Sequence, residues 1–282
     1  SETNPVSLPL TGTVAAGDGG RVRLRPGAAM RVLTGAPIPK GAEAVVMKEH
    51  CRVDGETVRI LRAPKTGEHV RAAGREYPKG ATVLSPPRRI TPPVVGMLAT
   101  VGRSTVRVYR RPRAAIVTTG NETVRPGEPL PPGAIYDANA PGLSAALRGI
   151  GQAQPKLLHA RDDVRDVKAA LRRALRSADV VITVGGVSVG EYDCVREAAA
   201  EVGIRGVFWR VAVKPGKPIC FGMLPERAGL FFGLPGNPVS ALVCWRQFVR
   251  PALLSVMGLD APPAVDATAL LASDVVRQPG RL

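Results

Sequence analysis

The chain has 282 residues, more than one typical domain needs, and 45% of them are hydrophobic, which allows a substantial core and suits a globular protein rather than a disordered one. Its longest uncharged stretch, residues 228–245, is interrupted by two prolines and an asparagine, so we do not interpret it as a membrane span. The net charge of +16 favours an anionic partner, but aromatic residues make up only 4% and do not alternate with the basic ones as in a nucleic-acid stacking surface.

The four cysteines point to a reducing compartment. Cys51, Cys194, Cys220 and Cys244 form no CxxC pair and have no regular spacing, which argues against a zinc site or a disulfide framework. No secretory signal is recognisable. We therefore predict a cytoplasmic protein.

Two segments precede the main domain. Residues 1–72 contain short runs rich in Val, Gly, Thr and Pro, such as "GRVRLRPG", "EAVVMKEH" and "ETVRILRAP", and these predict short strands of a small β-domain. Residues 73–112 are interrupted by prolines around a possible helix at 92–99, which predicts a connecting or lid segment. The stretch 73–113 holds half of the excess positive charge, which indicates first a solvated face and next a site for an anionic small molecule.

The pattern changes at residue 113. "RAAIVTTG" predicts a strand, and "DANAPGLSAALRGIG" predicts a helix capped by Asn139 with Pro141 in its first turn. "DDVRDVKAALRRALRSA" predicts a second helix with one apolar stripe, formed by Val164, Val167, Leu171 and Leu175.

Strands and helices continue to alternate after that. Residues 178–184 predict a buried strand, residues 193–202 a helix, and "GVFWRVAVKPGKPICFG" and "GLFFGLPGNPVSALVCWRQFV" follow. The alternation predicts a doubly wound α/β domain over residues 113–258. Its ligand would bind at the carboxyl ends of the strands.

Four charged loops fall at those strand ends. "TTGNET" contains Glu122, "IYDAN" contains Asp137, "TVGGVSVGEYD" ends in Asp193, and "KPGKP" offers Lys214 and Lys217 beside "GLPGNP". Each alone has an ordinary explanation, because a turn aspartate often caps its own backbone and "KPGKP" could be an exposed hairpin. Together they suit a ligand that combines phosphate with a hard cation such as Mg²⁺.

Two backbone features point to the same place. Gly185 and Gly186 end the buried strand where a backbone could approach a ligand closely. Asn237 and Pro238 are good cap and first-turn residues, so they would direct helix amides toward the same edge of the sheet.

Several long motifs closely resemble the molybdopterin molybdenumtransferase (molybdenum insertase) family, to which the gephyrin E domain belongs. They are "RVLTGAPIPKGAEAVVMKE", "TVGGVSVGEYD", "VAVKPGKP" and "GLPGNPVSAL", in that order. The resemblance covers nearly the whole chain. It implies an enzyme that takes adenylylated molybdopterin and molybdate, inserts the metal into the dithiolene and releases AMP with Mg²⁺ present.

The resemblance also implies an elongated homodimer whose site lies between the α/β domain of one subunit and the β-domain of the other. The expected catalytic and metal-binding residues are Asp193, Glu122 and Asp137. The expected substrate-binding residues are Thr34, Gly185, Gly186, Ser188, Lys214, Lys217, Pro235, Asn237 and Pro238. Thr34, in "LTGAPIP", would act across the interface.

The chain departs from the family pattern in three places. Asn121 stands where the family commonly has Asp, before the retained Glu122. The family's Met-Asp-Gly-Tyr-Ala segment, with an Asp of the site, is absent before Ser1, and residues 259–282 resemble only the start of a C-terminal β-domain. The resemblance thus predicts a fragment that binds molybdopterin or its adenylylated form and turns over poorly or not at all.

Three other functions stay open at this point. A related molybdopterin adenylyltransferase would share the α/β domain, although it lacks the "LTGAPIP" β-domain, and it is also a possible partner. A gephyrin-like scaffold would need an exposed apolar groove. A nucleic-acid binder is motivated by charge alone, and we expect neither nucleic acid nor membrane as a partner.

Overall fold

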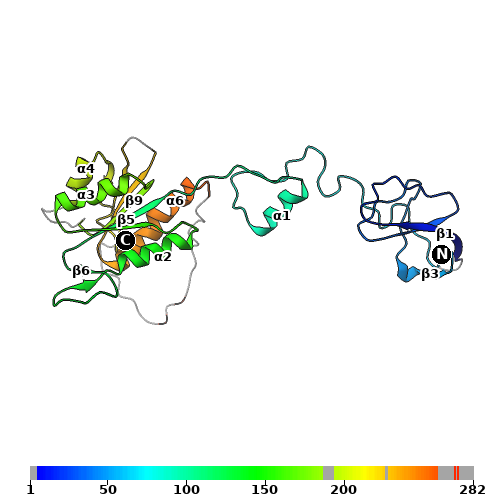
Figure 1. Ribbon diagram of the computed structural model, residues 1–282, viewed down its shortest axis with the longest axis horizontal. Helices are drawn as coiled ribbons and strands as arrows, with labels where there is room; N and C mark the ends of the chain where they lie inside the picture. The colour runs from blue at the N-terminus through cyan, green and yellow to red at the C-terminus, as the bar shows by residue number, and fades with distance from the viewer. Residues whose placement is uncertain (1–4, 187–193, 226–227, 260–269, 271, 273–282) are drawn as a thin grey trace. The chain divides into compact units, whose positions relative to one another are not determined.

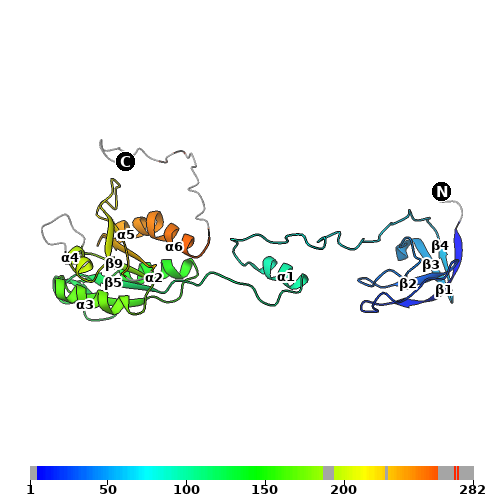
Figure 2. The ribbon, with the colours of Figure 1, turned by 90° about the horizontal axis from the view of Figure 1, so that it is seen from above.

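The computed structural model describes residues 5–186, 194–225, 228–259, 270 and 272. The chain divides into two compact units, Ser1–Leu84 and Ser85–Leu282, and each is described by itself. Figures 1 and 2 show the elements of both units from two directions. In the described residues no helix is both long and apolar enough to cross a membrane. The four segments expected from the sequence, with their three boundaries, remain predictions.

The first unit contains a four-stranded sheet in the order β2-β1-β4-β3. The strands are β1 (Val6–Val14), β2 (Ala29–Val32), β3 (Cys51–Asp54) and β4 (Thr57–Ile60). β1 pairs with β2 in parallel and with β4 antiparallel, and β3 and β4 form a hairpin. The two-residue loop between them, Gly55-Glu56, begins with a glycine at a φ of 55°, which suits a tight hairpin turn.

Two of the three strands expected in this unit were wrong, and "ETVRILRAP" was confirmed as β4. "GRVRLRPG" forms only an isolated bridge between Arg23 and Lys40. "EAVVMKEH" contains no strand and ends in a short 3-10 helix, η1 (Lys48–His50). Its Val45 amide donates to the carbonyl of Glu68, in a loop, so these runs bond to loops and extend no ladder.

The second unit begins with the expected helix, α1 (Pro92–Thr100), confirmed with Pro92 in its first turn. The main element is a six-stranded sheet in the order β10-β11-β12-β9-β5-β8. Its strands are β5 (Ala114–Thr119), β8 (Lys156–Ala160), β9 (Val180–Val184), β10 (Arg205–Trp209), β11 (Cys220–Met223) and β12 (Leu230–Leu234). β12, β9, β5 and β8 are parallel, and every residue of β9 is buried. The predicted α/β class is therefore confirmed.

Helices cover both faces of this sheet (Figures 1 and 2). α3 (Val164–Leu175) and α4 (Cys194–Glu201) pack on one face, where Val117 and Val181 join Val167 of α3 in one core cluster. α2 (Asn139–Gly149), α5 (Pro238–Cys244) and α6 (Arg250–Val256) cover the other face, where Ile116 and Ile182 pack with Leu143. Consecutive strand residues such as Ile116 and Val117 thus fill opposite cores.

Strand–helix alternation does not continue through the last part of the sheet. β11 pairs antiparallel with β10 on one side and with β12 on the other. The connections at 210–219 and 224–229 are too short for the crossover helix that parallel strands need. A further pair of short strands, β6 (Thr123–Val124) and β7 (Ile135–Tyr136), lies between β5 and α2.

Candidate active site

A cavity of about 360 Å³ lies at the carboxyl ends of the parallel strands, within the α/β unit. Loops that follow β5, β8, β9 and β12 supply its walls together with the start of α2. The described lining residues are Thr119, Gly120, Glu122, Thr123, Ile135, Tyr136, Asp137, Ala138, Asn139, Asp162, Gly185, Gly186, Pro218, Pro235, Gly236 and Pro238. This is the position at which open α/β sheets bind ligands.

Strand register brings the loops to one edge. Thr118 pairs with Val184, and Val184 pairs with Leu234, so β5, β9 and β12 end together. β11 runs antiparallel to β12, and its first residue, Cys220, pairs with Gly233 near the end of β12. The "KPGKP" turn that precedes β11 therefore lies at the same edge of the sheet.

Asp137 is buried at the start of α2. Its Oδ1 accepts hydrogen bonds from the backbone amides of Asn139 at 2.9 Å and Ala140 at 3.0 Å. These bonds satisfy amides that have no partner within the helix. Asp137, and not Asn139 as expected, is thus the capping side chain, while Nδ2 of Asn139 donates to the carbonyl of Gly236 at 2.8 Å.

The carboxylate of Glu122 lies close to Gly120, the residue that follows β5. A Cβ atom at Gly120 would lie 2.9 Å from each carboxylate oxygen of Glu122, so the carboxylate folds back over the strand end. The preceding residue, Asn121, accepts a hydrogen bond from the Asp162 amide at 3.3 Å. This contact links the loops after β5 and β8, and an aspartate at position 121 would accept the same hydrogen bond.

The glycine pair after β9 packs directly on β5. Gly185 and Gly186 have φ angles of 89° and 65°, which favour glycine. A Cβ atom at Gly185 would lie 2.7 Å from Oγ1 of Thr119 and 3.0 Å from the Thr119 carbonyl oxygen. The sequence predicts that the backbone of this glycine pair approaches a ligand closely. In the structure the pair packs closely against Thr119 of the neighbouring strand β5, at the wall of the cavity.

The "GLPGNP" loop begins α5. Oδ1 of Asn237 accepts hydrogen bonds from the amides of Val239 at 3.0 Å and Ser240 at 3.3 Å, which confirms the predicted cap, and Pro238 occupies the first turn. Capping accounts for the Asn237 side chain. The flanking prolines, Pro235 and Pro238, line the cavity.

The predicted site residues divide into four groups. Six line the cavity: Glu122, Asp137, Gly185, Gly186, Pro235 and Pro238. Lys214, Lys217 and Asn237 lie at the same edge of the sheet without lining the cavity, and both lysines are exposed. Thr34 is exposed after β2 in the other unit. Ser188 and Asp193 lie outside the described residues, as does most of the strand expected at 259–282.

Sequence reasoning missed several lining residues. Asp162 follows β8, a parallel strand, so the rule that selected the other loops would have found it. Pro218, in the "KPGKP" turn, reaches the cavity where the lysines beside it do not. Thr119 and Asn139 also line it, and no sequence signal distinguishes their side chains from ordinary strand and helix residues.

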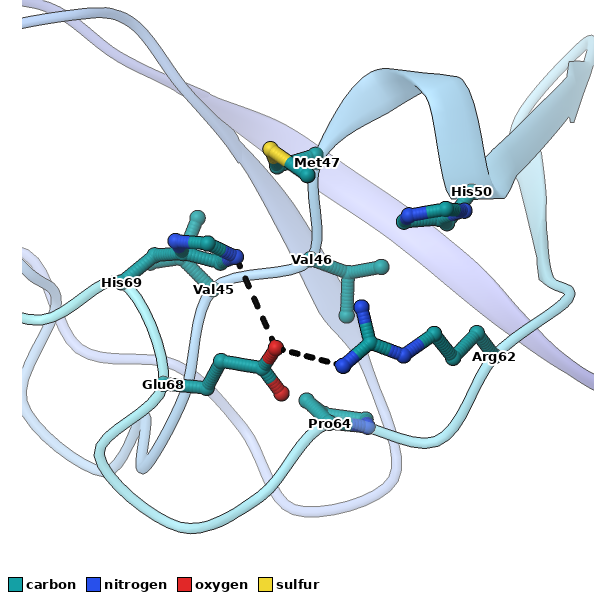
Figure 3. Close-up of a pocket in the computed structure, with 8 residues that line it drawn as sticks. All are labelled: Val45, Val46, Met47, His50, Arg62, Pro64, Glu68 and His69. Atoms are coloured by element: carbon teal, nitrogen blue, oxygen red, sulfur yellow. Dashed lines mark hydrogen bonds and ion pairs between the residues drawn. The ribbon is translucent and has the colours of Figure 1, made fainter. Parts of the chain in front are cut away.

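A second hollow lies in the first unit, and it is too small for a ligand (Figure 3). Its volume is about 10 Å³, close to the room that one water needs. Oε1 of Glu68 accepts a hydrogen bond from Arg62 at 2.8 Å and lies 3.6 Å from Nε2 of His69. The backbone amide of Lys65 and then the Arg62 charge lower the pKa of Glu68. We therefore interpret this hollow as a gap beside an ion-pair cluster of Arg62, Glu68 and His69, and not as a ligand site.

Comparisons with known proteins agree with this geometry. Residues 1–102 match the family described as "MoeA N-terminal region (domain I and II)", and residues 115–255 match the "Probable molybdopterin binding domain". The chain is 38% identical to molybdopterin molybdenumtransferase 2 of Mycobacterium tuberculosis over 283 residues, covering 99% of this chain and 69% of that protein.

Two further relatives extend the comparison. A molybdopterin molybdenumtransferase of Nostoc sp. is 38% identical over 257 residues, covering 90% of this chain and 59% of that protein. The crystal structure of a molybdopterin biosynthesis MoeA protein from Pyrococcus horikoshii superposes with a TM-score of 0.78 at 33% identity, covering 93% of this chain and 65% of that one. The chain therefore belongs to the molybdopterin molybdenumtransferase family, the transferases of molybdenum cofactor biosynthesis.

Proposed function

We propose that this chain inserts molybdenum from molybdate into adenylylated molybdopterin and releases AMP, with its cavity in the α/β unit as the substrate site. The observation that carries the proposal is that cavity, in which carboxylates from separate strand-end loops meet a helix start and a glycine pair. Family membership supplies the reaction class.

The carboxylates fit a partial site for Mg²⁺. Among the described residues no three His, Cys, Asp or Glu side chains lie close enough to hold a metal by themselves. Mg²⁺ commonly uses one or two carboxylates together with substrate phosphates and water. Glu122 would supply one such oxygen ligand, and Asp137 would supply its Oδ2, because Oδ1 accepts two amides. When bound, the ion would neutralise charge that develops on the phosphate.

The chain's other residues would bind and orient the substrates. Lys214 and Lys217, at the same edge of the sheet, would attract the anionic groups by charge-assisted contacts. Ser188 and Asp193, which follow Gly186 in the sequence and lie outside the described residues, are also proposed site residues. Pro235 and Pro238 would form a rigid apolar wall, since the proline ring restricts the backbone.

A molybdate-dependence assay tests the proposal. The chain is incubated with adenylylated molybdopterin and Mg²⁺, and AMP is measured by chromatography with and without molybdate. We expect AMP release that depends on molybdate and falls to background in Glu122→Gln. A slow rate is enough to support the proposal, provided that it depends on molybdate. The insertase assignment would be contradicted if AMP release were the same with and without molybdate. It would also be contradicted if the chain bound adenylylated molybdopterin and released no AMP.

The assembly and setting follow from the same proposal. We propose a homodimer in which Thr34 of one subunit completes the site of the other, a molybdopterin adenylyltransferase as the partner that supplies the substrate, and action in the cytoplasm. The match of residues 1–102 to the MoeA N-terminal region disfavours the adenylyltransferase as the chain's own activity, since that enzyme resembles the α/β unit alone.

A further inference from the structure

Two buried side-chain oxygens in the described part of the chain have no hydrogen-bond partner. They are Oγ1 of Thr119 and Oδ1 of Asn139, and both residues line the cavity. The contact of Nδ2 of Asn139 with the Gly236 carbonyl fixes which amide atom is the unpaired one, since the reverse orientation would oppose two acceptors. A buried polar atom without a partner is unfavourable, and its presence at a cavity suggests that a ligand supplies the partner.

Thr119 contributes a buried hydroxyl that has no hydrogen-bond partner among the described residues. The described lining carboxylates, Glu122, Asp137 and Asp162, only accept hydrogen bonds when ionised. The other side-chain donors of the described lining are bonded to backbone carbonyls: Tyr136 to Glu128, Thr123 to Gly120 and Asn139 to Gly236. An oxygen acceptor on the ligand is the group that matches the remaining hydroxyl.

The position of Thr119 at the end of β5 supports a ligand contact. The residue is 6% exposed, and its Oγ1 is covered by the glycine pair, since Cβ atoms at Gly185 and Gly186 would lie 2.7 Å and 3.1 Å from it. The two residues that cover the hydroxyl carry no side chains, and they line the cavity themselves. The neighbouring Thr118 differs, because its hydroxyl lies 3.3 Å from Nδ1 of His159.

We infer that Thr119 is a ligand-contact residue whose hydroxyl donates a hydrogen bond to an anionic oxygen of the substrate, either of the adenylyl phosphate or of molybdate. The inference rests on the proposed function of the cavity. It assigns a neutral donor to the lining of the cavity, whereas the charged side chains of Lys214 and Lys217 lie at the same edge of the sheet without lining it.

Three variants of the whole chain separate this role from a structural one. Thr119→Val removes the hydroxyl at nearly constant volume, Thr119→Ser keeps it, and Thr118→Val removes a hydroxyl that already has a partner. Binding of AMP and, separately, of molybdate is measured by calorimetry, and unfolding is followed by heating.

We expect Thr119→Val to weaken binding of AMP or of molybdate about tenfold, the size of one hydrogen bond to a charged group. Its melting temperature should equal or exceed that of the wild type, because an unpaired buried hydroxyl is lost. Thr119→Ser should bind within about twofold of the wild type. Thr118→Val should melt lower and bind normally.

The ligand that loses affinity identifies the oxygen: AMP alone assigns phosphate and molybdate alone assigns the metal oxyanion. Equal binding by Thr119→Val and the wild type would overturn the inference and leave the proposed function standing. A lower melting temperature with unchanged binding would mean that Thr119 is structural. If the wild type binds neither probe, the proposed function and the inference both fail.

Discussion

Asp137 combines two roles that sequence analysis had treated as alternatives. Its Oδ1 accepts the first amides of α2, which is the ordinary work of a turn aspartate, and the residue also lines the cavity. The cap fixes the carboxylate in place, so that Oδ2 can face a ligand without a further loss of side-chain entropy. A structural explanation of a residue therefore does not exclude a functional one.

Substitutions at Asp137 should separate these roles. Asp137→Asn keeps an oxygen acceptor for the amides, so we expect it to lose under about 1 kcal/mol of folding stability and most of its turnover. Asp137→Ala should lose turnover and a further 1 kcal/mol or so, because the cap is gone. Urea unfolding and AMP release check both. Equal stability of the two variants would mean that the cap contributes little.

Glu122 and Lys214 should differ in the step they affect. Glu122→Gln should slow AMP release about 100-fold while AMP binds within about twofold of the wild type, because the proposed metal role of Glu122 requires its charge. Lys214→Ala should weaken AMP binding itself about tenfold by removing a charge-assisted contact. Calorimetry and the release assay measure the two effects.

The control for that pair is Glu128→Gln, an exposed carboxylate in the loop between β6 and β7. It should leave both binding and release unchanged. If Glu122→Gln and Lys214→Ala lose the same amount of binding, the assignment of a metal role to Glu122 is wrong.

At the residue scale, the site could be predicted where a residue type and a strand end coincide. Glu122 and Asp137 meet both conditions and line the cavity. Thr119 could not be selected from the sequence, because what distinguishes it from Thr118 is the face of β5 on which it lies and the lack of a hydrogen-bond partner. Both properties arise from tertiary packing.

At the element scale, long periodic segments were predictable and short ones were not. α3 was confirmed because its apolar stripe repeats over three turns, with Val167 and Leu171 fully buried and Asp163 capping the helix. "EAVVMKEH" was wrong as a strand because a run so short takes its conformation from whichever backbone it meets, here the loop at Glu68. The antiparallel pairing of β10, β11 and β12 follows from their short connections, which leave no room for a crossover helix. Strand–helix alternation alone does not predict it.

One electrostatic contact ties the amino ends of β5 and β9. Oδ2 of Asp179 accepts hydrogen bonds from Arg110 at 2.8 Å and from the Arg113 amide at 2.7 Å. The hydrogen bond from Arg110 is the largest cause that lowers the pKa of Asp179 far below its usual range, against the opposing effect of burial. A carboxylate with a lowered pKa in the folded state stabilises the fold above its unfolded pKa, and this stabilisation is lost as pH falls.

Asp179→Asn should therefore be destabilising near neutral pH by about 1–2 kcal/mol, and the difference from the wild type should shrink below about pH 4, where the unfolded carboxyl becomes protonated. Urea unfolding followed by tryptophan fluorescence reports the α/β unit, because both tryptophans, Trp209 and Trp245, lie there. Glu197→Gln, an exposed carboxylate of α4, is the control and should show no such pH dependence. A constant difference from pH 7 to pH 3 would contradict the assignment.

At the scale of the whole molecule, the described cavity belongs to one unit and a predicted substrate residue belongs to the other. The described lining residues all come from Ser85–Leu282, whereas Thr34 lies in Ser1–Leu84. No periodicity or motif in the chain indicates which subunit of a dimer supplies Thr34 to a given site. The prediction of a site shared between two subunits therefore rests on family resemblance alone. A homodimer with exchanged β-units would give Thr34 a place at the site of its partner.

Mixing two inactive variants tests this arrangement. Thr34→Ala chains and Glu122→Gln chains are each expected to turn over poorly alone. In a mixed dimer with shared sites, one site carries both substitutions and the other carries neither, so random exchange should restore about a quarter of wild-type AMP release. Subunit exchange is verified by mass-tagged chains, and Glu122→Gln mixed with Asp137→Asn is the control, since both residues lie in the same unit and no intact site can form. Recovery in the first mixture and not in the second would establish a site built by two chains, while no recovery despite verified exchange would mean that Thr34 and Glu122 serve the same chain.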